Sequence, residues 1–181
     1  MSSGSSLKGY IPAIARLVGS SPAALYERQR ALVRAGLLAM EDGRGPGSGV
    51  RTSWDSVALL LLSLLATDKL SDSEARVNAI GSAKATHFKL CRFTGLPTFS
   101  GALTEILTQK SLAARTIEIS VSRTADRAII KFRGPNKTEN QSTFEGENAR
   151  EPGIRVMATL SGDPLQKIAA DVHEIILNDF D

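Results

Sequence analysis

Arginine is concentrated in one short segment of the chain, and its side chain is well suited to bind phosphate and guanine. Four arginines, Arg16, Arg28, Arg30 and Arg34, lie between residues 11 and 38. A guanidinium group can donate two parallel hydrogen bonds to guanine O6 and N7, and it can neutralise a backbone phosphate. Whether this chemistry is available depends on whether one element presents several of these arginines together.

The same segment has the pattern of two short helices separated by a tight turn. Apolar residues recur at helical spacing from 11 to 18, and Gly19 is a suitable helix stop. Ser21 is then a good N-cap, with Pro22 at the first helical position, where its missing N–H costs nothing. We expect the second helix to run from Pro22 to about Ala35.

A helical wheel of the second helix separates an apolar side from a basic side. Gln29 and Leu32 fall within about 40° of Leu25 on this wheel, and the three residues predict the packing face. The opposite side is predicted to carry small and charged residues, namely Ala23, Glu27, Arg30 and Arg34, with Tyr26 and Arg28 on the flanks. A helix anchored by its leucines therefore presents arginines to solvent.

A glycine-rich segment follows the second helix. Two strand-like pieces, near 37–40 and 50–52, flank the stretch GRGPGSG, which is too rich in Gly and Pro to form a helix. This pattern predicts a β-hairpin with a long tip. The four glycines between residues 43 and 49 allow its backbone to approach a partner closely.

Together, the stretches IARLVGSSPAALYERQRALVRAGLL and GRGPGSGVRTS resemble the winged helix-turn-helix domain of bacterial and phage transcription regulators. In that family the second helix reads bases in the major groove, and the hairpin wing lies along the phosphate backbone or in the minor groove. The resemblance covers about a quarter of the chain. It implies that the following residues contact DNA: Ser20, Ser21, Ala23, Tyr26, Glu27, Arg28, Arg30, Arg34, Arg44 and Arg51.

Two features depart from a simple match to this family. Phosphates repel a carboxylate, so Glu27 either accepts a hydrogen bond from a cytosine amino group or orients a neighbouring arginine. The family also usually has another helix before the pair, and only about ten residues precede Ile11. The missing wall of the three-helix core must then come from residues 54–66 or from another subunit.

The middle of the chain predicts further helices. Ser53 can cap a helix over residues 54–66, and the capping-box pattern SDSE at residues 71–74 predicts a helix that continues to about Thr86. The stretch THFKLCRFTGLP reads as an irregular segment. A further helix is expected near residues 99–109, from the spacing of its leucines and isoleucine.

The end of the chain changes to a pattern of β-strands. The stretches TIEISVSRT, RAIIKFRG and IRVMATLSG are rich in β-formers and predict three strands. The polar segment 135–153 is expected to be a mobile surface loop. Asp163 and Pro164 supply a cap and a first position for a last amphipathic helix that ends near Leu177.

These elements predict an α+β fold, with an N-terminal winged helix-turn-helix domain and additional helices, followed by a C-terminal β-β-β-α segment. The first ten residues are expected to be a flexible arm. The expected domain order is then the winged helix-turn-helix domain over 11–68, a helical connecting region over 69–112 and a β-β-β-α dimerisation or partner-binding domain over 113–181.

The charge distribution favours an anionic partner for the first half of the chain only. Residues 1–95 hold 12 Lys and Arg against 7 Asp and Glu, whereas residues 96–181 hold 10 against 12. The single cysteine, Cys91, excludes an intrachain disulfide and favours a reducing, cytoplasmic location at the nucleoid. The apolar run 57–66 is shorter than the roughly 20 residues that a membrane span needs, so no membrane association is expected.

The sequence carries no pattern typical of a catalytic or metal site. His87 and His173 are far apart, and with one cysteine they do not predict a structural zinc site. The stretch GRGPGSG lacks the lysine of a phosphate-binding loop. The cluster HFKLCRF either touches nucleic acid or simply packs its aromatic rings. We therefore expect no enzymatic activity, no cofactor and no metal.

The function predicted from the sequence is a sequence-specific regulator that binds double-stranded DNA as a homodimer. A single small helix-turn-helix buries too little surface for strong specificity, and pairing on two half-sites is the usual remedy. Helix 54–66 and the C-terminal segment are the expected dimerisation surfaces, and the latter also suits a protein partner. Two alternatives stay open, a phage-type structural nucleoprotein such as a small packaging subunit and a winged-helix protein–protein adaptor.

Overall fold

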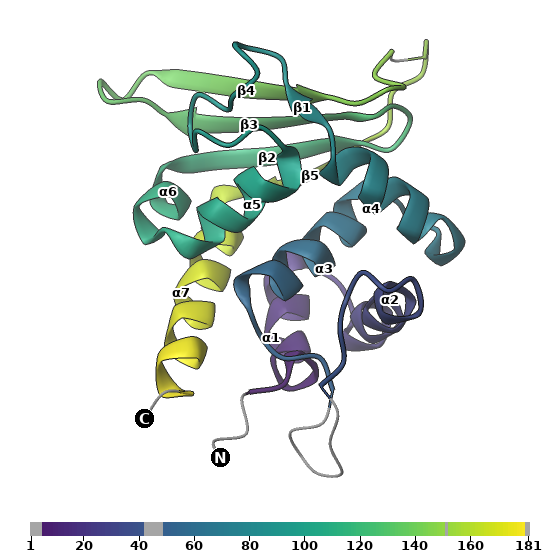
Figure 1. Cartoon of the computed structure of the whole chain (residues 1–181). Coiled ribbons are helices and arrows are strands. Elements are labelled where there is room, and N and C mark those ends of the chain that lie inside the picture. Colours follow the sequence, from purple (N-terminus) through teal and green to yellow (C-terminus); the bar gives the residue numbers. More distant parts are fainter. Residues whose placement is uncertain (1–4, 42–48, 151, 180–181) are drawn as a thin grey trace.

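The computed structural model describes residues 5–41, 49–150 and 152–179, and it places helices against one face of an antiparallel sheet (Figure 1). The α+β class is therefore confirmed. The helices are α1 Leu7–Val18, α2 Pro22–Arg34, α3 Trp54–Ala66, α4 Ser73–Gly81, α5 Phe99–Thr108, α6 Lys110–Arg115 and α7 Gly162–Asn178. The strands are β1 Lys84–Ala85, β2 Thr116–Ser122, β3 Arg127–Arg133, β4 Glu139–Glu145 and β5 Met157–Ser161.

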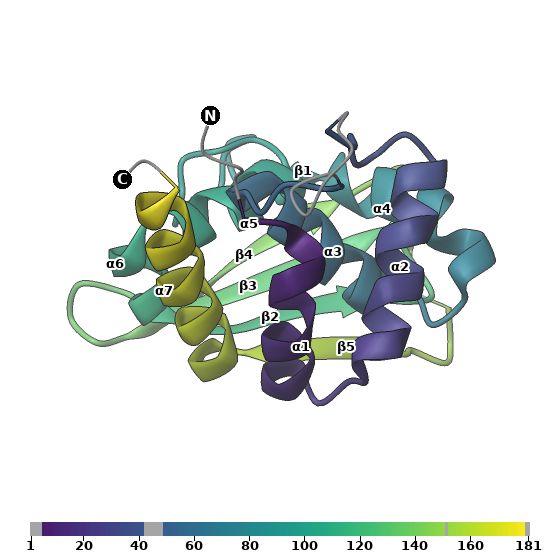
Figure 2. The same cartoon turned by 90° about the horizontal axis from the view of Figure 1, so that it is seen from below.

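The sheet has the strand order β1-β4-β3-β2-β5, and each neighbouring pair is antiparallel. Side chains alternate between its two faces, so apolar residues such as Ile119, Ile130 and Phe144 are fully buried on the helix side. Polar pairs occupy the other face, where Lys131 Nζ lies 2.7 Å from Glu118 Oε1. Figure 2 shows the helices in front of this sheet, with α1 and α2 side by side.

Helix α1 begins four residues earlier than the sequence analysis expects. Leu7, Tyr10 and Ile14 are buried, and they continue the helical spacing toward the N-terminus. Ser6 caps the helix, because its hydroxyl accepts a hydrogen bond from the Gly9 N–H at 3.3 Å. The expected flexible arm over residues 1–10 is therefore wrong for residues 5–10, which are held in the fold.

Three arginines, from α2, from α4 and from the segment after β2, bind the last four carbonyl groups of α3. Arg28 of α2 donates to the Ser63 carbonyl at 2.7 Å, and Arg123, after β2, donates to those of Leu64 and Leu65. Arg76 of α4 donates to the Ala66 carbonyl at 3.5 Å. A helix C-terminus leaves four carbonyls without intrahelical partners and carries partial negative charge. These guanidinium groups donate hydrogen bonds to the carbonyls, and their positive charge is attracted to the helix end.

The segment expected to be a mobile loop contains a strand, and that expectation is wrong. Strand β4 pairs with β3 along its whole length and with β1 at its end. Ser142 and Phe144 are buried, whereas Gln141 and Glu145, which flank them, are exposed. Its polar composition arises because most of its side chains face solvent. The C-terminal part is therefore β-β-β-β-α, with one strand more than expected.

Helix α4 also differs from the expectation. It begins at Ser73 after a short 3₁₀ turn at Leu70–Asp72, and the Ser71 hydroxyl donates to Asp72 instead of capping the helix. The helix ends at Gly81, and Lys84–Ala85 then forms the edge strand β1. Helix α6 is unexpected, and α7 begins at Gly162 with Ser161 in the cap position, two residues earlier than the expected cap at Asp163.

One continuous apolar cluster extends from Leu7 of α1 to Val172 of α7. Helix α5 packs against both α3 and α7, and these three helices carry the cluster from α2 to the sheet. No break in it marks the expected boundary near residue 113. The helix pair α1–α2 and the sheet are therefore parts of a shared core.

Candidate nucleic-acid interface

Helix α2 is anchored by the leucines that the sequence indicates. Leu25 and Leu32 are fully buried, and α2 packs against α1 and α3. Ser21 caps its start, accepting a hydrogen bond from the Ala24 N–H at 3.1 Å, with Pro22 next to it. Helix α3 thus supplies the third wall of the core from the same chain, so that no second subunit is needed for it.

The outward side of α2 stands free of the described parts of the chain. Ala23, Arg30 and Arg34 are exposed, and the Arg30 side chain keeps 70% of its surface. Among the described residues, Arg34 has no hydrogen bond or ion pair. Ser20 and Ser21 lie at the start of the helix, next to this side. The guanidinium groups of Arg30 and Arg34 can therefore reach an external ligand.

Arg28 is not part of this exposed side, and its expected role in binding DNA is wrong. Only 6% of the residue is exposed, and its guanidinium donates to the Ser63 carbonyl. Burial lowers the pKa of Arg28, with the charge of nearby Arg123 acting in the same direction and that of Asp68 opposing it. At about 60° from the leucine row, a long side chain turns toward the C-terminus of α3.

Glu27 holds Arg30 in place on the exposed side. Its Oε1 lies 2.7 Å from the Arg30 guanidinium nitrogen, one turn along the helix. Of the two roles that the sequence leaves open for Glu27, orienting a neighbouring arginine agrees with this contact. An exposed pair of this kind contributes little stability, so its main effect is on the direction of the arginine.

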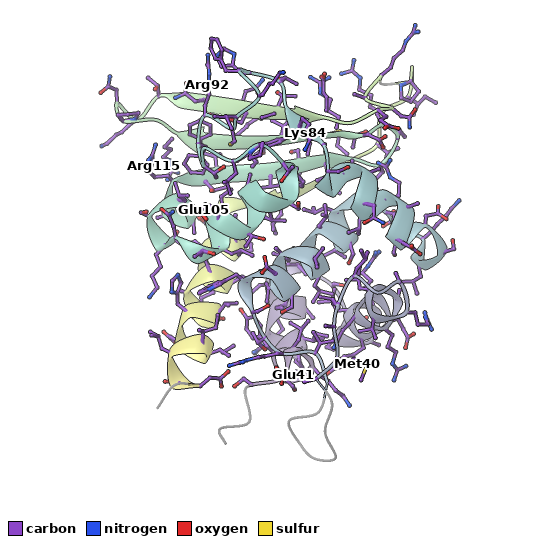
Figure 3. All side chains as sticks on the ribbon, in the orientation of Figure 1. Met40, Glu41, Lys84, Arg92, Glu105 and Arg115 are labelled. Carbon is purple, nitrogen blue, oxygen red and sulfur yellow. The ribbon has the colours of Figure 1, made fainter. Side chains whose placement is uncertain are left out.

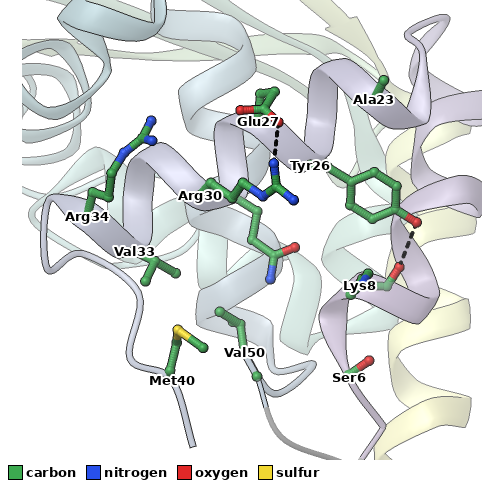
Figure 4. A pocket seen from close by; sticks show the side chains of 12 residues that line it. Ser6, Lys8, Ala23, Tyr26, Glu27, Arg30, Val33, Arg34, Met40 and Val50 are labelled. Atoms are coloured by element: carbon green, nitrogen blue, oxygen red, sulfur yellow. Dashed lines mark hydrogen bonds and ion pairs between the residues drawn. The ribbon is translucent and has the colours of Figure 1, made fainter. Parts of the chain in front are cut away.

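Tyr26 connects the outward side of α2 to the first turn of α1. Its hydroxyl donates to the Lys8 carbonyl at 3.3 Å (Figure 4). This carbonyl lacks its usual helical partner, because the residue four positions later is Pro12, which has no N–H. The tyrosine thus satisfies a group that the proline leaves open, and it brings Lys8 beside α2.

A small antiparallel arrangement lies at the base of the expected wing. The Glu41 N–H donates to the Gly49 carbonyl at 2.9 Å, so the chain leaves and returns side by side. The returning segment then pairs with the N-terminal residues, because Ser6 and Arg51 form a bridge. Arg51 is exposed. Arg44 and most of the glycines of the wing lie outside the described residues.

A groove of about 610 Å³ lies between α2, the start of α1 and the base of the wing. Figure 4 shows Arg30 and Arg34 along one wall, with Met40 and Val50 opposite. Figure 3 shows that Met40 and Glu41 lie on the side of the molecule away from the sheet. The groove is lined by Ser6, Lys8, Ala23, Tyr26, Glu27, Gln29, Arg30, Val33, Arg34, Met40, Gly49 and Val50.

The groove brings together five of the predicted residues and several that sequence reasoning missed. The sequence analysis expects Ser6 and Lys8 in a flexible arm, although the apolar spacing that starts at Leu7 indicates a helix there. Gln29 was placed on the packing face, but it is half-buried and lines the groove. Met40 and Val50 come from the base of the expected wing. No local sequence pattern predicts the position of this segment relative to α2.

The stretch HFKLCRF divides between the core and the surface. Phe93 stacks on Phe132 at a ring distance of 4.3 Å, and Cys91 is buried. Phe88, in contrast, is 86% exposed. The ring of His173, far from His87 in the chain, lies 4.3 Å from the Trp54 ring in a tilted arrangement. Packing thus accounts for part of this cluster only.

Comparison with known protein families, with curated proteins and with solved structures finds no match to this chain. Within the described residues, no helix is both long and apolar enough to cross a membrane.

Proposed function

We propose that the chain is a sequence-specific regulator that binds double-stranded DNA through a winged helix-turn-helix unit. Helix α2 enters the major groove, and the wing around residues 43–51 contacts the backbone or the minor groove. The single observation that carries this proposal is the exposure of Arg30 and Arg34 on a helix whose opposite side is fully buried. A short helix supported in this way is the reading element of helix-turn-helix proteins.

The groove beside α2 suits one backbone strand of a duplex. Lys8, Arg30 and Arg34 place positive charge along it, and the N-terminal end of α2 with its exposed serine lies nearby. Backbone phosphates bind to such cations and to helix N-termini. Val33 and Met40 offer apolar contacts to the sugars between the phosphates.

The pair formed by Glu27 and Arg30 contributes to selectivity in this proposal. The carboxylate fixes the direction of the guanidinium before DNA arrives, so less conformational entropy is lost on binding. It also repels phosphates, which weakens binding in positions where Arg30 meets no base. A regulator benefits from both effects, because non-specific DNA competes for it.

A random-pool selection tests the proposal. Duplexes that the protein retains at a stated salt concentration are sequenced, and we expect one enriched motif that Arg30→Ala or Arg34→Ala relaxes at individual positions. Arg133→Ala serves as a matched control, because Arg133 is also exposed but lies on β3. If no motif is enriched, or if the control changes the motif as much as the α2 variants, the proposal is wrong.

A protein–protein adaptor is the second candidate, and the apolar part of the groove favours it. Tyr26, Val33, Met40 and Val50 give the groove an apolar lining, in which Met40 keeps 59% of its surface and Val50 is buried. An adaptor with this groove binds a peptide in it, and its retention on DNA at physiological salt is unaffected by Arg30→Ala and Arg34→Ala.

A further inference from the structure

The two edges of the sheet differ in a way that matters for assembly. The edge at β1 is two residues long and carries Lys84, which Figure 3 labels beside the sheet. The chain itself covers this edge, because the Ala85 N–H donates to the Pro97 carbonyl at 3.0 Å. Short length, a lysine and a covering segment are the usual means by which a protein prevents edge-to-edge pairing.

The edge at β5 has none of these protections. Strand β5 is the last in the sheet order, and no other described strand pairs with its outer side. The chain entering it is apolar and exposed: Ile154 keeps 79% of its surface, Val156 44% and Met157 41%. Arg155 is the one charged residue between Ile154 and Ser161. An unpaired edge with exposed apolar side chains is a template for another strand.

The backbone groups that β5 offers can be assigned from its pairing with β2. The Arg123 N–H donates to the Val156 carbonyl at 2.8 Å, and Ala158 and Leu160 follow opposite Val121 and Ile119. Antiparallel strands alternate in the side to which their N–H and C=O groups point. The groups of Met157 and Thr159 therefore point outward, away from β2.

We propose that this edge pairs with the same edge of a second copy of the chain, in antiparallel orientation, to form a homodimer with a continuous sheet. An antiparallel edge is complementary to itself, because outward N–H and C=O groups alternate along it. A two-fold axis then places the N–H groups of one copy opposite the C=O groups of the other. The exposed apolar side chains of the two copies then cover one another. The protected β1 edge stops the assembly at two copies.

The orientation of the two copies also bears on DNA binding, and this step rests on the proposed function. The two-fold axis of such a pair is perpendicular to the sheet, so the helices of both copies lie on the same side of the joined sheet. Figure 2 shows α2 on that side together with the other helices. Both α2 helices then face the same way, which is the requirement for reading two inverted half-sites.

The first test is the mass of the full chain in solution, measured by sedimentation equilibrium at tens of micromolar. We expect twice the 19.3 kDa of one chain. The double variant Val156→Lys, Met157→Lys puts like charges across the axis, and Thr159→Pro removes one outward N–H while leaving the bonds to β2. Both are expected to halve the mass. Leu177→Lys, at an exposed leucine of α7, is the control and keeps the dimer.

A second measurement needs no variant. The amide protons of Met157 and Thr159 exchange slowly in the wild-type chain if a partner strand binds them, and exchange quickly when dilution separates the copies. A monomeric or larger wild-type mass, rapid exchange of both amides at high concentration, or halving of the mass by Leu177→Lys alone would each overturn the proposal.

The failure of this inference can be distinguished from failure of the proposed function. Arg34→Ala is expected to reduce DNA binding and leave the dimer mass unchanged. The edge variants are expected to lose preference for two inverted half-sites while a single half-site still binds. A dimer that does not bind DNA contradicts only the proposed function, and a monomer that binds DNA contradicts only the edge pairing.

Discussion

At the scale of single residues, the three arginines of α2 have two different roles. Arg30 and Arg34 are exposed, whereas Arg28 is buried and binds a carbonyl of α3. A helical wheel separates the exposed pair from the leucines, but it places Arg28 on a flank. Only the position of α3 decides that this flank is covered. The sequence thus predicts that Arg30 and Arg34 are exposed, whereas the burial of Arg28 depends on a tertiary contact.

The role of Arg28 gives a prediction about stability. Replacing it with Met leaves the buried Ser63 carbonyl without its donor, so we expect the free energy of unfolding to fall by about 1–3 kcal/mol. Arg34→Met, on the exposed side of the same helix, is expected to change it by no more than about 0.5 kcal/mol. Urea unfolding followed by circular dichroism measures both. Equal effects would show that Arg28 is not a structural residue.

The contact between Glu27 and Arg30 gives a prediction about selectivity. Glu27→Gln removes a charge that repels phosphates and releases Arg30, so we expect tighter binding to duplexes of unrelated sequence. Preference for the selected motif should fall at the same time. Competition binding between the motif and random DNA, at one salt concentration, measures the ratio. An unchanged ratio would contradict an orienting role for Glu27.

At the scale of elements, local patterns predict the helices with clear caps and the strands with clear alternation. Helices α2 and α3 begin at the residues that Ser21 and Ser53 indicate. The sequence does not predict strand β4, because most of its side chains face solvent and only Phe144 on its buried face is apolar. The groove could not be predicted either, since it forms between α2 and segments that are distant or irregular in the sequence.

The junction between β5 and α7 gives a prediction at this scale. A methyl group added at Gly162 would lie 2.1 Å from the Thr116 carbonyl oxygen, a backbone atom that cannot move easily. We expect Gly162→Ala to destabilise the fold by about 1–3 kcal/mol or more. Gly9→Ala in α1 is the matched control, because its added methyl meets only the Ser6 hydroxyl, at 3.7 Å. That change should raise the melting temperature, since alanine favours helix over glycine. Similar melting temperatures for the two variants would contradict this packing.

At the scale of the whole molecule, the helix pair and the sheet share one core instead of forming separate domains. The arginines at the end of α3 add to this connection, because they come from α2, from α4 and from the segment after β2. The sequence suggests a boundary near residue 113, where helical patterns give way to β-strands. A change of pattern does not reveal whether the two parts pack against each other.

This shared core predicts a single cooperative unfolding transition. Scanning calorimetry should show one transition whose calorimetric enthalpy equals its van't Hoff enthalpy, once the dissociation of any dimer is included in the analysis. Residues 113–181 alone are expected to remain unfolded, because residues such as Ile119 and Phe144 would lose the helices that cover them. Two separated transitions, or a folded C-terminal fragment, would contradict the description of one core.

We propose that the exposed side of α2 meets the phosphates and bases of a duplex. The most direct measurement is the dependence of DNA affinity on salt concentration for the wild-type chain and for the double variant Arg30→Ala, Arg34→Ala. We expect weaker binding and a smaller salt slope, reduced by about 0.9 for each of the two arginines that contacts a phosphate instead of a base. A double variant with the affinity and salt slope of the wild type would contradict the claim.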